Sequence, residues 1–330
     1  MSLWSLMGLY VASVIGAGFA SGQELAVFFV NYGKSGLWGI MAAVLVLTLG
    51  SGLVLDYCAS TNASSYAQIF ARFHPRLRLL LDGLYSLFLL VGLGVMLAGI
   101  GAMGSTALSG LMLRLLTSMI ILFVLNKGVE GVAKASSWLA PFLVLTMCGF
   151  AFFHFKSGKL AVPNQGSWRA LEAGILYGSY NLGFSMTVLA SIQSYISTRK
   201  ERWKLALLAN LALGICMVLL FLALSALDVE QLKTSFPLEH LVPGLGWAEA
   251  AYELLLWGAM YSTAIAHALA LTNRIADTYG LSWNGAGSII VLLSFSLSYF
   301  GFGPLIRIGY PILGLVGLWI LANLAWDHVV

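Results

Sequence analysis

The chain has 330 residues, of which 60% are hydrophobic and 9% are charged, and its formal net charge is +4. A soluble domain carries about 25% charged residues, so the composition excludes a soluble protein and predicts an all-α integral membrane protein. The small net charge gives no reason to expect nucleic-acid binding. The three cysteines are isolated, so neither a disulfide nor a metal site is expected. The first apolar segment lacks signal-peptide features and is expected to be retained.

A helix needs about 20 apolar residues to cross a bilayer, and windows of that length predict ten transmembrane helices. The predicted spans are 3–31, 35–59, 78–104, 108–125, 134–156, 168–197, 203–226, 247–275, 284–300 and 304–325. A polar stretch at 64–78 is expected to form a short amphipathic helix on the membrane surface. Lys and Arg gather on the side of the N-terminus, which predicts that both termini lie in the cytoplasm.

The first predicted span contains the stretch VIGAGFASGQE (14–24), with three glycines where a helix interior is expected. Glycine is about 1 kcal/mol worse than alanine inside a helix, and an acid such as Glu24 at membrane depth is expensive. Two interpretations are open. The stretch is either a small-residue face for close helix packing or a helix that is broken at the membrane midplane.

The sixth predicted span has a matching defect, in the stretch ILYGSYNLGFSMTVL (175–189). Glycine and polar residues interrupt its apolar pattern. Gly16 and Asn181 lie 165 residues apart, which is half of the chain length. The sequence therefore predicts two corresponding five-helix halves, and because five crossings is an odd number, the second half inserts upside down relative to the first.

The predicted halves are residues 1–165 and 166–330, with broken helices at about 16–22 and 179–185. Paired interrupted helices in an inverted repeat indicate a transporter site near the membrane midplane. Unwinding frees backbone groups that lipid does not solvate. Freed N–H groups at a half-helix start suit an anion, and freed carbonyls suit a hard cation.

Five short motifs resemble the pattern of the neurotransmitter:sodium symporters and occur in the order of that family. They are VIGAG (14–18), GLVLDY (52–57), KGVEGVAK (127–134) followed by Pro141, NLGFS (181–185) and AMYSTAIA (259–266). The chain also resembles the YkvI family of bacterial permeases, within the amino acid–polyamine–organocation superfamily. The resemblance implies the LeuT-type fold, a 5+5 inverted repeat of ten helices in which helices 1 and 6 are broken.

The resemblance implies one sodium site between helices 1 and 8. Its ligands would be the hydroxyls of Ser262 and Thr263 and the backbone carbonyls of Ala12, Ile15 and Ala259. Hard cations take oxygen ligands, and neutral oxygens suffice when enough of them converge. The alternative for the two hydroxyls is a hydrogen bond to the preceding turn of their own helix.

The resemblance also implies a substrate site at the two breaks. A substrate carboxylate would be held by the amides around Gly16, Ala17 and Gly18. The substrate body would lie against Ser179, Tyr180, Asn181 and Phe184. Helix 3 carries glycines at this level, so the pocket is expected to be open on that side.

Several positions depart from the symporter pattern. Phe19 stands where the family often has an asparagine ligand for a second sodium ion, so one sodium ion is expected. Two charges at membrane depth should pair, and we predict a reversed outer gate between Glu24 and Arg307. Glu253 competes as the partner of Arg307, and Glu24 meeting a substrate amine is a further possibility. Asp56 is expected to cap freed amides of the broken helices, or else to be a paired acid near the inner interface.

Together, the residues and the resemblance predict a secondary active transporter of the bacterial inner membrane that carries a small zwitterionic or carboxylate-bearing solute, an amino acid or derivative, by sodium symport. The resemblance implies that helices 1, 2, 6 and 7 rock against helices 3, 4, 8 and 9. No enzyme motif, cofactor or protein partner is expected; the bilayer, the solute and sodium are the expected partners. Alternatives are proton coupling through Lys134 or His267, exchange, a channel, or a solute sensor with a transporter fold.

Overall fold

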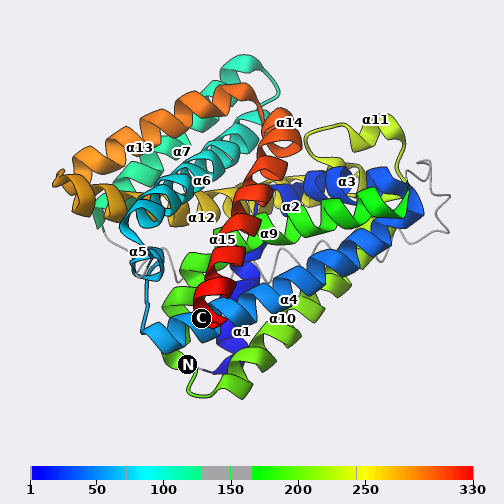
Figure 1. Cartoon of the computed structure of the whole chain (residues 1–330). Helices are drawn as coiled ribbons and strands as arrows, with labels where there is room; N and C mark the ends of the chain where they lie inside the picture. The colour runs from blue at the N-terminus through cyan, green and yellow to red at the C-terminus, as the bar shows by residue number, and fades with distance from the viewer. Residues whose placement is uncertain (1, 72, 128–148, 150–165, 243, 330) are drawn as a thin grey trace.

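The computed structural model of the chain describes residues 2–71, 73–127, 149, 166–242 and 244–329 (Figure 1). All regular secondary structure in these residues is helical. Seven of the described segments are long and apolar enough to cross a membrane: Val30–Thr61, Pro75–Ala102, Ala107–Asn126, Arg199–Leu224, Gly246–Tyr279, Trp283–Phe300 and Phe302–Asp327. The predicted fifth span and Lys134 lie outside the described residues, so the count of ten spans and the inverted repeat stay predictions.

The helices follow the predicted spans closely. The first half contains α1 (Leu3–Val14), α2 (Ala17–Ser21), α3 (Gln23–Phe28), η1 (Val30–Ser35), α4 (Gly36–Thr61), α5 (Tyr66–Phe70), α6 (Pro75–Ala102) and α7 (Ala107–Lys127). The second half contains α9 (Ser167–Ile192), η2 (Gln193–Tyr195), α10 (Arg199–Leu224), α11 (Val229–Leu232), η3 (Pro237–Leu241), α12 (Gly246–Tyr279), α13 (Trp283–Leu297), η4 (Ser298–Phe300), α14 (Phe302–Pro304), η5 (Leu305–Gly309) and α15 (Tyr310–Val329). The polar stretch at 64–78 does contain a short helix, α5, and the Ser65 side chain caps it.

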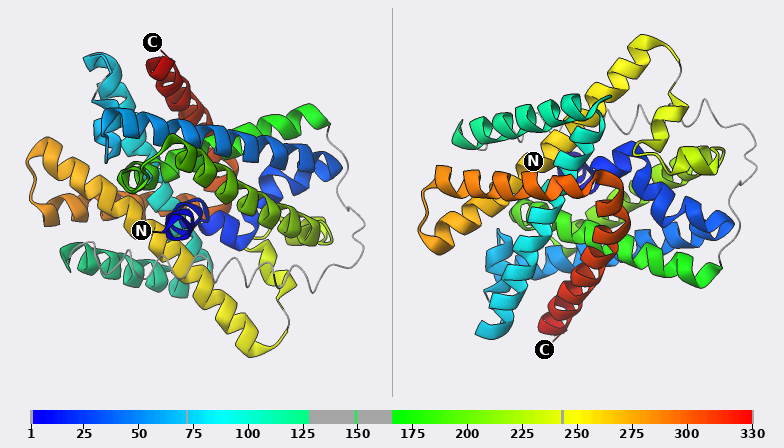
Figure 2. Two further views of the ribbon diagram at one scale, coloured as in Figure 1. Left: turned by 90° about the horizontal axis from the view of Figure 1, so that it is seen from below. Right: turned by 90° about the horizontal axis from the view of Figure 1, so that it is seen from above.

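The long helices pack in two groups (Figures 1 and 2). In the first group, α9 packs against both α4 and α15, α10 packs against α4, and α1 contacts α9 and α10. In the second group, α6 packs against α12, α13 and α7. Helices 1, 2, 6 and 7 of the predicted scheme therefore lie in the first group, and helices 3, 4, 8 and 9 form the second.

The first span leaves helical geometry at two points. Helix α1 ends at Val14, and Gly16 has an extended backbone with φ −95° and ψ −169° before α2 begins. Gly22, with φ 80°, then separates α2 from α3. A positive φ favours glycine, and a Cβ there would lie 2.6 Å from the Leu238 side chain. The glycines of this span thus include two that interrupt the helix.

The sixth span is not interrupted. Helix α9 runs without a break from Ser167 to Ile192, so the prediction of a broken helix at 179–185 is wrong for this structure. The polar side chains bond back to their own helix. Ser179 Oγ donates to the Ile175 carbonyl at 2.8 Å, and Asn181 Nδ2 donates to the Tyr177 carbonyl at 3.0 Å. Such bonds satisfy polar side chains inside a continuous membrane helix.

The glycines of α9 serve close packing, which was the alternative interpretation for the first span. A Cβ at Gly174 would overlap the Gly39 carbonyl oxygen on α4, and a Cβ at Gly178 would lie 2.9 Å from the Val46 side chain. On the other flank, Gly317 of α15 faces the Ser179 backbone. Small residues let helix backbones approach each other in a membrane. These glycines therefore allow α4 and α15 to pack closely against α9, and those of α9 do not mark a break in the helix.

An ion pair joins the two central helices of the second group. Arg274 on α12 donates to Asp82 on α6 through Nε at 2.8 Å and Nη2 at 2.6 Å, and both side chains are largely buried. We expect Asp82→Ala and Arg274→Ala each to destabilise the protein by about 1–3 kcal/mol, because charged hydrogen bonds of this kind are lost. A double-mutant cycle of denaturation midpoints in detergent measures the coupling, and strictly additive losses would contradict a direct interaction.

Candidate functional site

The break in the first span redirects backbone hydrogen bonds. In a continuous helix the Gly16 N–H would donate to the Ala12 carbonyl. Here it donates to the Val14 carbonyl at 3.0 Å, and the Ile15 N–H donates to the Val11 carbonyl at 3.0 Å. The Ala12 carbonyl is thereby released from its usual partner, at one of the positions predicted to supply a sodium ligand.

The two predicted hydroxyl ligands lie side by side on α12. Ser262 Oγ and Thr263 Oγ1 both donate to the Ala259 carbonyl, at 3.0 and 3.1 Å. Hydrogen bonds from these hydroxyls to the preceding turn of their own helix were the alternative interpretation in the sequence analysis. These bonds do not use the hydroxyl lone pairs, which remain acceptors. Both side chains are only partly buried. Helix α12 also reaches the region after the break, since Tyr252 donates to the Ala20 carbonyl at 3.3 Å.

The predicted substrate residues on α9 lie in a packed interior. The Phe184 ring stacks on the His267 imidazole at 4.8 Å between centroids. A Cβ at Gly92 on α6 would lie 2.6 Å from Phe184 and 2.7 Å from His267, so these rings fill the space that the helix 3 glycine leaves. The expectation that the pocket is open on this side is wrong for this structure. His267 Nδ1 is buried without a hydrogen-bond partner in the described part of the chain.

Glu24 is the charged group nearest to the break. Its side chain is 2% exposed, and a Cβ at Gly18 would overlap its carboxyl group. The carboxyl also interacts with the hydroxyls of Tyr177 and Tyr180 on α9. The alignment is loose, since neither hydroxyl nor Glu24 Oε2 forms a hydrogen bond of good geometry among the described residues. The two tyrosines are three residues apart, so they share one face of α9. This spacing could have identified Tyr177, which sequence reasoning missed, as a neighbour of the predicted site residue Tyr180.

The predicted gate between Glu24 and Arg307 is not formed in this structure. Glu24 lies in the interior beside Tyr177 and Tyr180, whereas Arg307 is exposed on the π-helical turn η5. Arg307 Nη2 donates to the Lys233 carbonyl at 3.3 Å, and Arg307 lines a pocket of about 290 Å³ with Phe28, Tyr32, Arg169 and Glu172 among its other residues. The competing residue Glu253 is exposed on α12.

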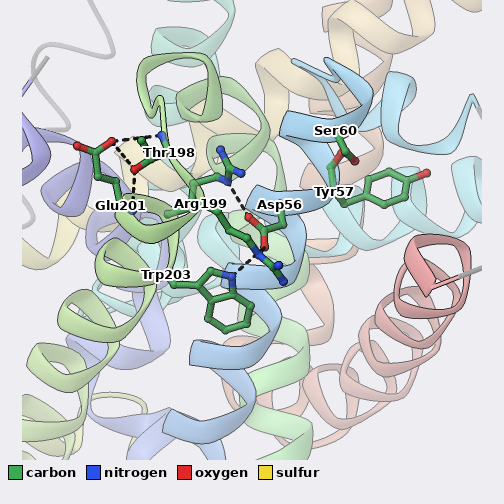
Figure 3. Close-up of polar contacts among 8 residues, drawn as sticks. Asp56, Tyr57, Ser60, Thr198, Arg199, Glu201 and Trp203 are labelled. Carbon is green, nitrogen blue, oxygen red and sulfur yellow. Dashed lines mark hydrogen bonds and ion pairs between the residues drawn. The ribbon is translucent and has the colours of Figure 1, made fainter.

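Asp56 does not cap the broken helix. It lies near the end of α4 and accepts hydrogen bonds from Arg199 Nε, Arg202 Nε and Trp203 Nε1 at 2.8, 2.7 and 2.8 Å (Figure 3). The capping box of Thr198 and Glu201 begins α10 at this point and places its first turn against the carboxylate. The sequence alternative, a paired acid, is the arrangement found.

The comparisons with known proteins agree with this architecture. The chain is 26% identical over 323 residues to the membrane protein YkvI of Bacillus subtilis (strain 168), covering 94% of this chain and 91% of that protein. It is 26% identical over 229 residues to the branched-chain amino acid permease BrnQ of Lactobacillus delbrueckii subsp. lactis, covering 60% of this chain and 50% of that permease. No family model matches the chain.

Among solved structures, the chain is similar to MhsT in complex with L-phenylalanine, with a TM-score of 0.68 and 15% identity. The match covers 96% of this chain and 88% of that chain. The chain shares the fold of MhsT, which is a LeuT-type fold. It is a multi-pass membrane protein.

Proposed function

We propose that the chain is a secondary active transporter that couples the entry of one sodium ion to the symport of a small zwitterionic or carboxylate-bearing solute, an amino acid or derivative. The released Ala12 carbonyl at the helix break is the observation that carries the proposal. The BrnQ relative, a branched-chain amino acid permease by name, and the MhsT neighbour, solved with L-phenylalanine, support the solute class.

In this proposal sodium binds the carbonyls of Ala12, Ile15 and Ala259 and the hydroxyls of Ser262 and Thr263. Five neutral oxygens suit a hard monovalent cation. The solute carboxylate binds the amides around Gly16–Gly18. Because the ion and the solute contact neighbouring turns at one break, the two bind cooperatively. Alternating access follows from rocking of the α1, α4, α9 and α10 group against the α6, α7, α12 and α13 group.

The test is thermal stability of the purified protein in sodium chloride against potassium and choline chloride, with a panel of amino acids. A ligand present at 100 times its Kd adds about 2.7 kcal/mol to the stability of the folded state. We expect a sodium-specific shift that Ser262→Ala and Thr263→Ala strongly reduce. Thr272→Ala is the matched control, since Thr272 lies on the same helix and donates to the Ala268 carbonyl in the same way. If all three variants lost the sodium-specific stability shift equally, the proposed sodium site would be contradicted.

Accumulation in proteoliposomes separates a transporter from a sensor. An imposed sodium gradient is expected to concentrate the amino acid that stabilises the protein, and binding without accumulation would point to a sensor instead.

Proton coupling is the second candidate, supported by the buried His267 Nδ1 that has no partner among the described residues. Proton coupling predicts that the solute-induced shift in thermal stability depends on pH rather than on sodium. His267→Gln should then remove this pH dependence.

A further inference from the structure

Glu24 differs from the acids that the fold pairs. Asp56 and Asp82 are both largely buried, and each holds an arginine. Glu24 is buried as well, yet among the described residues no Lys or Arg forms an ion pair with it. An ionised carboxyl that is removed from water without a counter-charge or hydrogen bonds is strongly destabilising. Of the buried acids among the described residues, Glu24 is therefore the one whose charge no arginine or lysine balances.

Buried polar atoms without hydrogen-bond partners lie on the two helices that meet at Glu24, α3 and α9. The Tyr177 and Tyr180 hydroxyls, Glu24 Oε2 and Gln23 Oε1 are all buried and lack hydrogen-bond partners in the described part of the chain. Native proteins leave only a few buried polar groups per 100 residues unsatisfied. Two residues of α3 and two of α9 contribute all four of these atoms, and the Glu24 carboxyl interacts with both hydroxyls. Glu24 and the two tyrosine hydroxyls thus offer unused hydrogen-bonding atoms at one place between α3 and α9.

Aromatic rings form the walls of this site. The Phe28 ring lies 5.6 Å from both the Tyr177 and the Tyr180 ring centroids, and the Tyr310 ring lies 4.5 Å from Tyr180. Aromatic faces carry negative charge density and attract desolvated cations. A carboxylate enclosed by such faces, with hydroxyl oxygens that accept hydrogen bonds, matches the three donors and single charge of a primary ammonium group.

The site adjoins the predicted place of the substrate carboxylate. The Glu24 carboxyl lies over Gly18, so close that a Cβ at Gly18 would overlap it. In an α-amino acid the ammonium and carboxylate groups are attached to the same carbon. A solute whose carboxylate meets the amides around Gly16–Gly18 therefore has its ammonium group within reach of Glu24.

We propose that Glu24, together with the hydroxyls of Tyr177 and Tyr180, binds the primary ammonium group of the transported solute. The inference rests on the proposed function and narrows the substrate class to solutes that carry a free amine. Phe28 contacts both tyrosines and also lines the 290 Å³ pocket that contains Arg307.

The experiment uses matched ligands on the full-length protein. The probes are the amino acid of a twenty-member panel that stabilises the protein most, its decarboxylated amine and its deaminated acid; L-leucine, isopentylamine and 4-methylpentanoate are one such set. Glu24→Gln keeps the shape of the side chain and removes its charge. We expect it to weaken binding of the amino acid and of the amine at least thirtyfold, and to change binding of the deaminated acid by less than about twofold.

Tyr180→Phe is the second variant, and it is expected to weaken the same two probes about tenfold by removing one hydroxyl. It keeps the test decisive if Glu24→Gln does not fold. Asp82→Asn is the matched control, because it removes the charge of a buried acid that is already paired. It should affect all three probes alike.

Two outcomes overturn the inference. If Glu24→Gln weakens the deaminated acid as much as the amine, Glu24 acts on the fold or on ion coupling rather than on the ammonium group. If wild-type protein binds the deaminated acid as tightly as the amino acid, no ammonium site exists. Either result leaves sodium-coupled uptake intact. If no amino acid and none of the twenty corresponding amines stabilises the wild-type protein, both the inference and the proposed function fail.

Discussion

Replacing Asp56 with alanine is expected to lower the free energy of unfolding by about 3–5 kcal/mol, because it leaves the largely buried Arg202 without its counter-charge. Asp56 is 5% exposed and receives three hydrogen bonds from the first five residues of α10. A Cβ at Gly52, one turn before it, would lie 2.7 Å from the Trp203 ring. The missing side chain at Gly52 thus lets the indole reach the carboxylate.

The three donors are expected to contribute unequally. Arg199 is 73% exposed, so Arg199→Ala should cost less than about 1 kcal/mol. Arg202 is 14% exposed, and Arg202→Ala should cost about 2–4 kcal/mol since it leaves Asp56 short of its best-buried partner. Denaturation midpoints of the purified variants give the order. Equal losses for the two arginine variants would contradict the graded burial on which this prediction depends.

Gly174→Ala is expected to be among the most damaging small substitutions, with a loss of about 3 kcal/mol or more. Its Cβ would overlap the carbonyl oxygen of Gly39 and lie 2.7 Å from the carbonyl carbon. Both atoms belong to the α4 backbone, which has no rotamer to move out of the way. Because α4 and α9 form the most extensive contact among the described helices, separating them also disturbs α15 and α10.

Gly83→Ala is the control for Gly174→Ala. Gly83 is an exposed residue inside α6, and a Cβ there meets nothing within 4 Å. Alanine is preferred over glycine in a helix interior by about 0.5–1 kcal/mol, so this variant should be neutral or slightly more stable. Thermal midpoints of the two variants in the same detergent make the comparison. A Gly174→Ala protein as stable as the control would show that the contact yields without loss.

Much of the fold was predictable because membrane insertion depends on local properties. Apolar length placed α4, α6, α7, α10 and α12 close to their observed bounds, since lipid admits only segments whose backbone bonds are satisfied internally. The interpretation of the glycines was less secure. Gly16 and Gly22 interrupt the first span, yet Gly174 and Gly178 in the sixth span only admit neighbouring helices. Glycine can either interrupt a helix or admit a neighbouring helix, and the residues packed around it decide which of the two occurs.

For the polar residues, too, the sequence identified the candidates and the structure decided their partners. The sequence named Ser262 and Thr263 as candidates, and left open the back-bond to Ala259 that the structure contains. It also named Glu24 but paired it with Arg307, because charges at membrane depth should find partners. Tertiary packing instead turns Glu24 toward Tyr177 and Tyr180 and leaves Arg307 at the surface. The sequence pattern of one helix does not predict which residues of another helix lie next to it.

By itself, the sequence determined that this chain is a helical membrane protein and where most of its helices begin and end. These properties follow from hydrophobic length and from backbone preferences that act within a few residues. Only the tertiary structure decided that α9 stays continuous, that Asp56 holds the start of α10, and that Glu24 lies beside Tyr177 and Tyr180 with no ion pair among the described residues. The last two depend on groups that are more than 100 residues apart in the chain and meet only when helices pack.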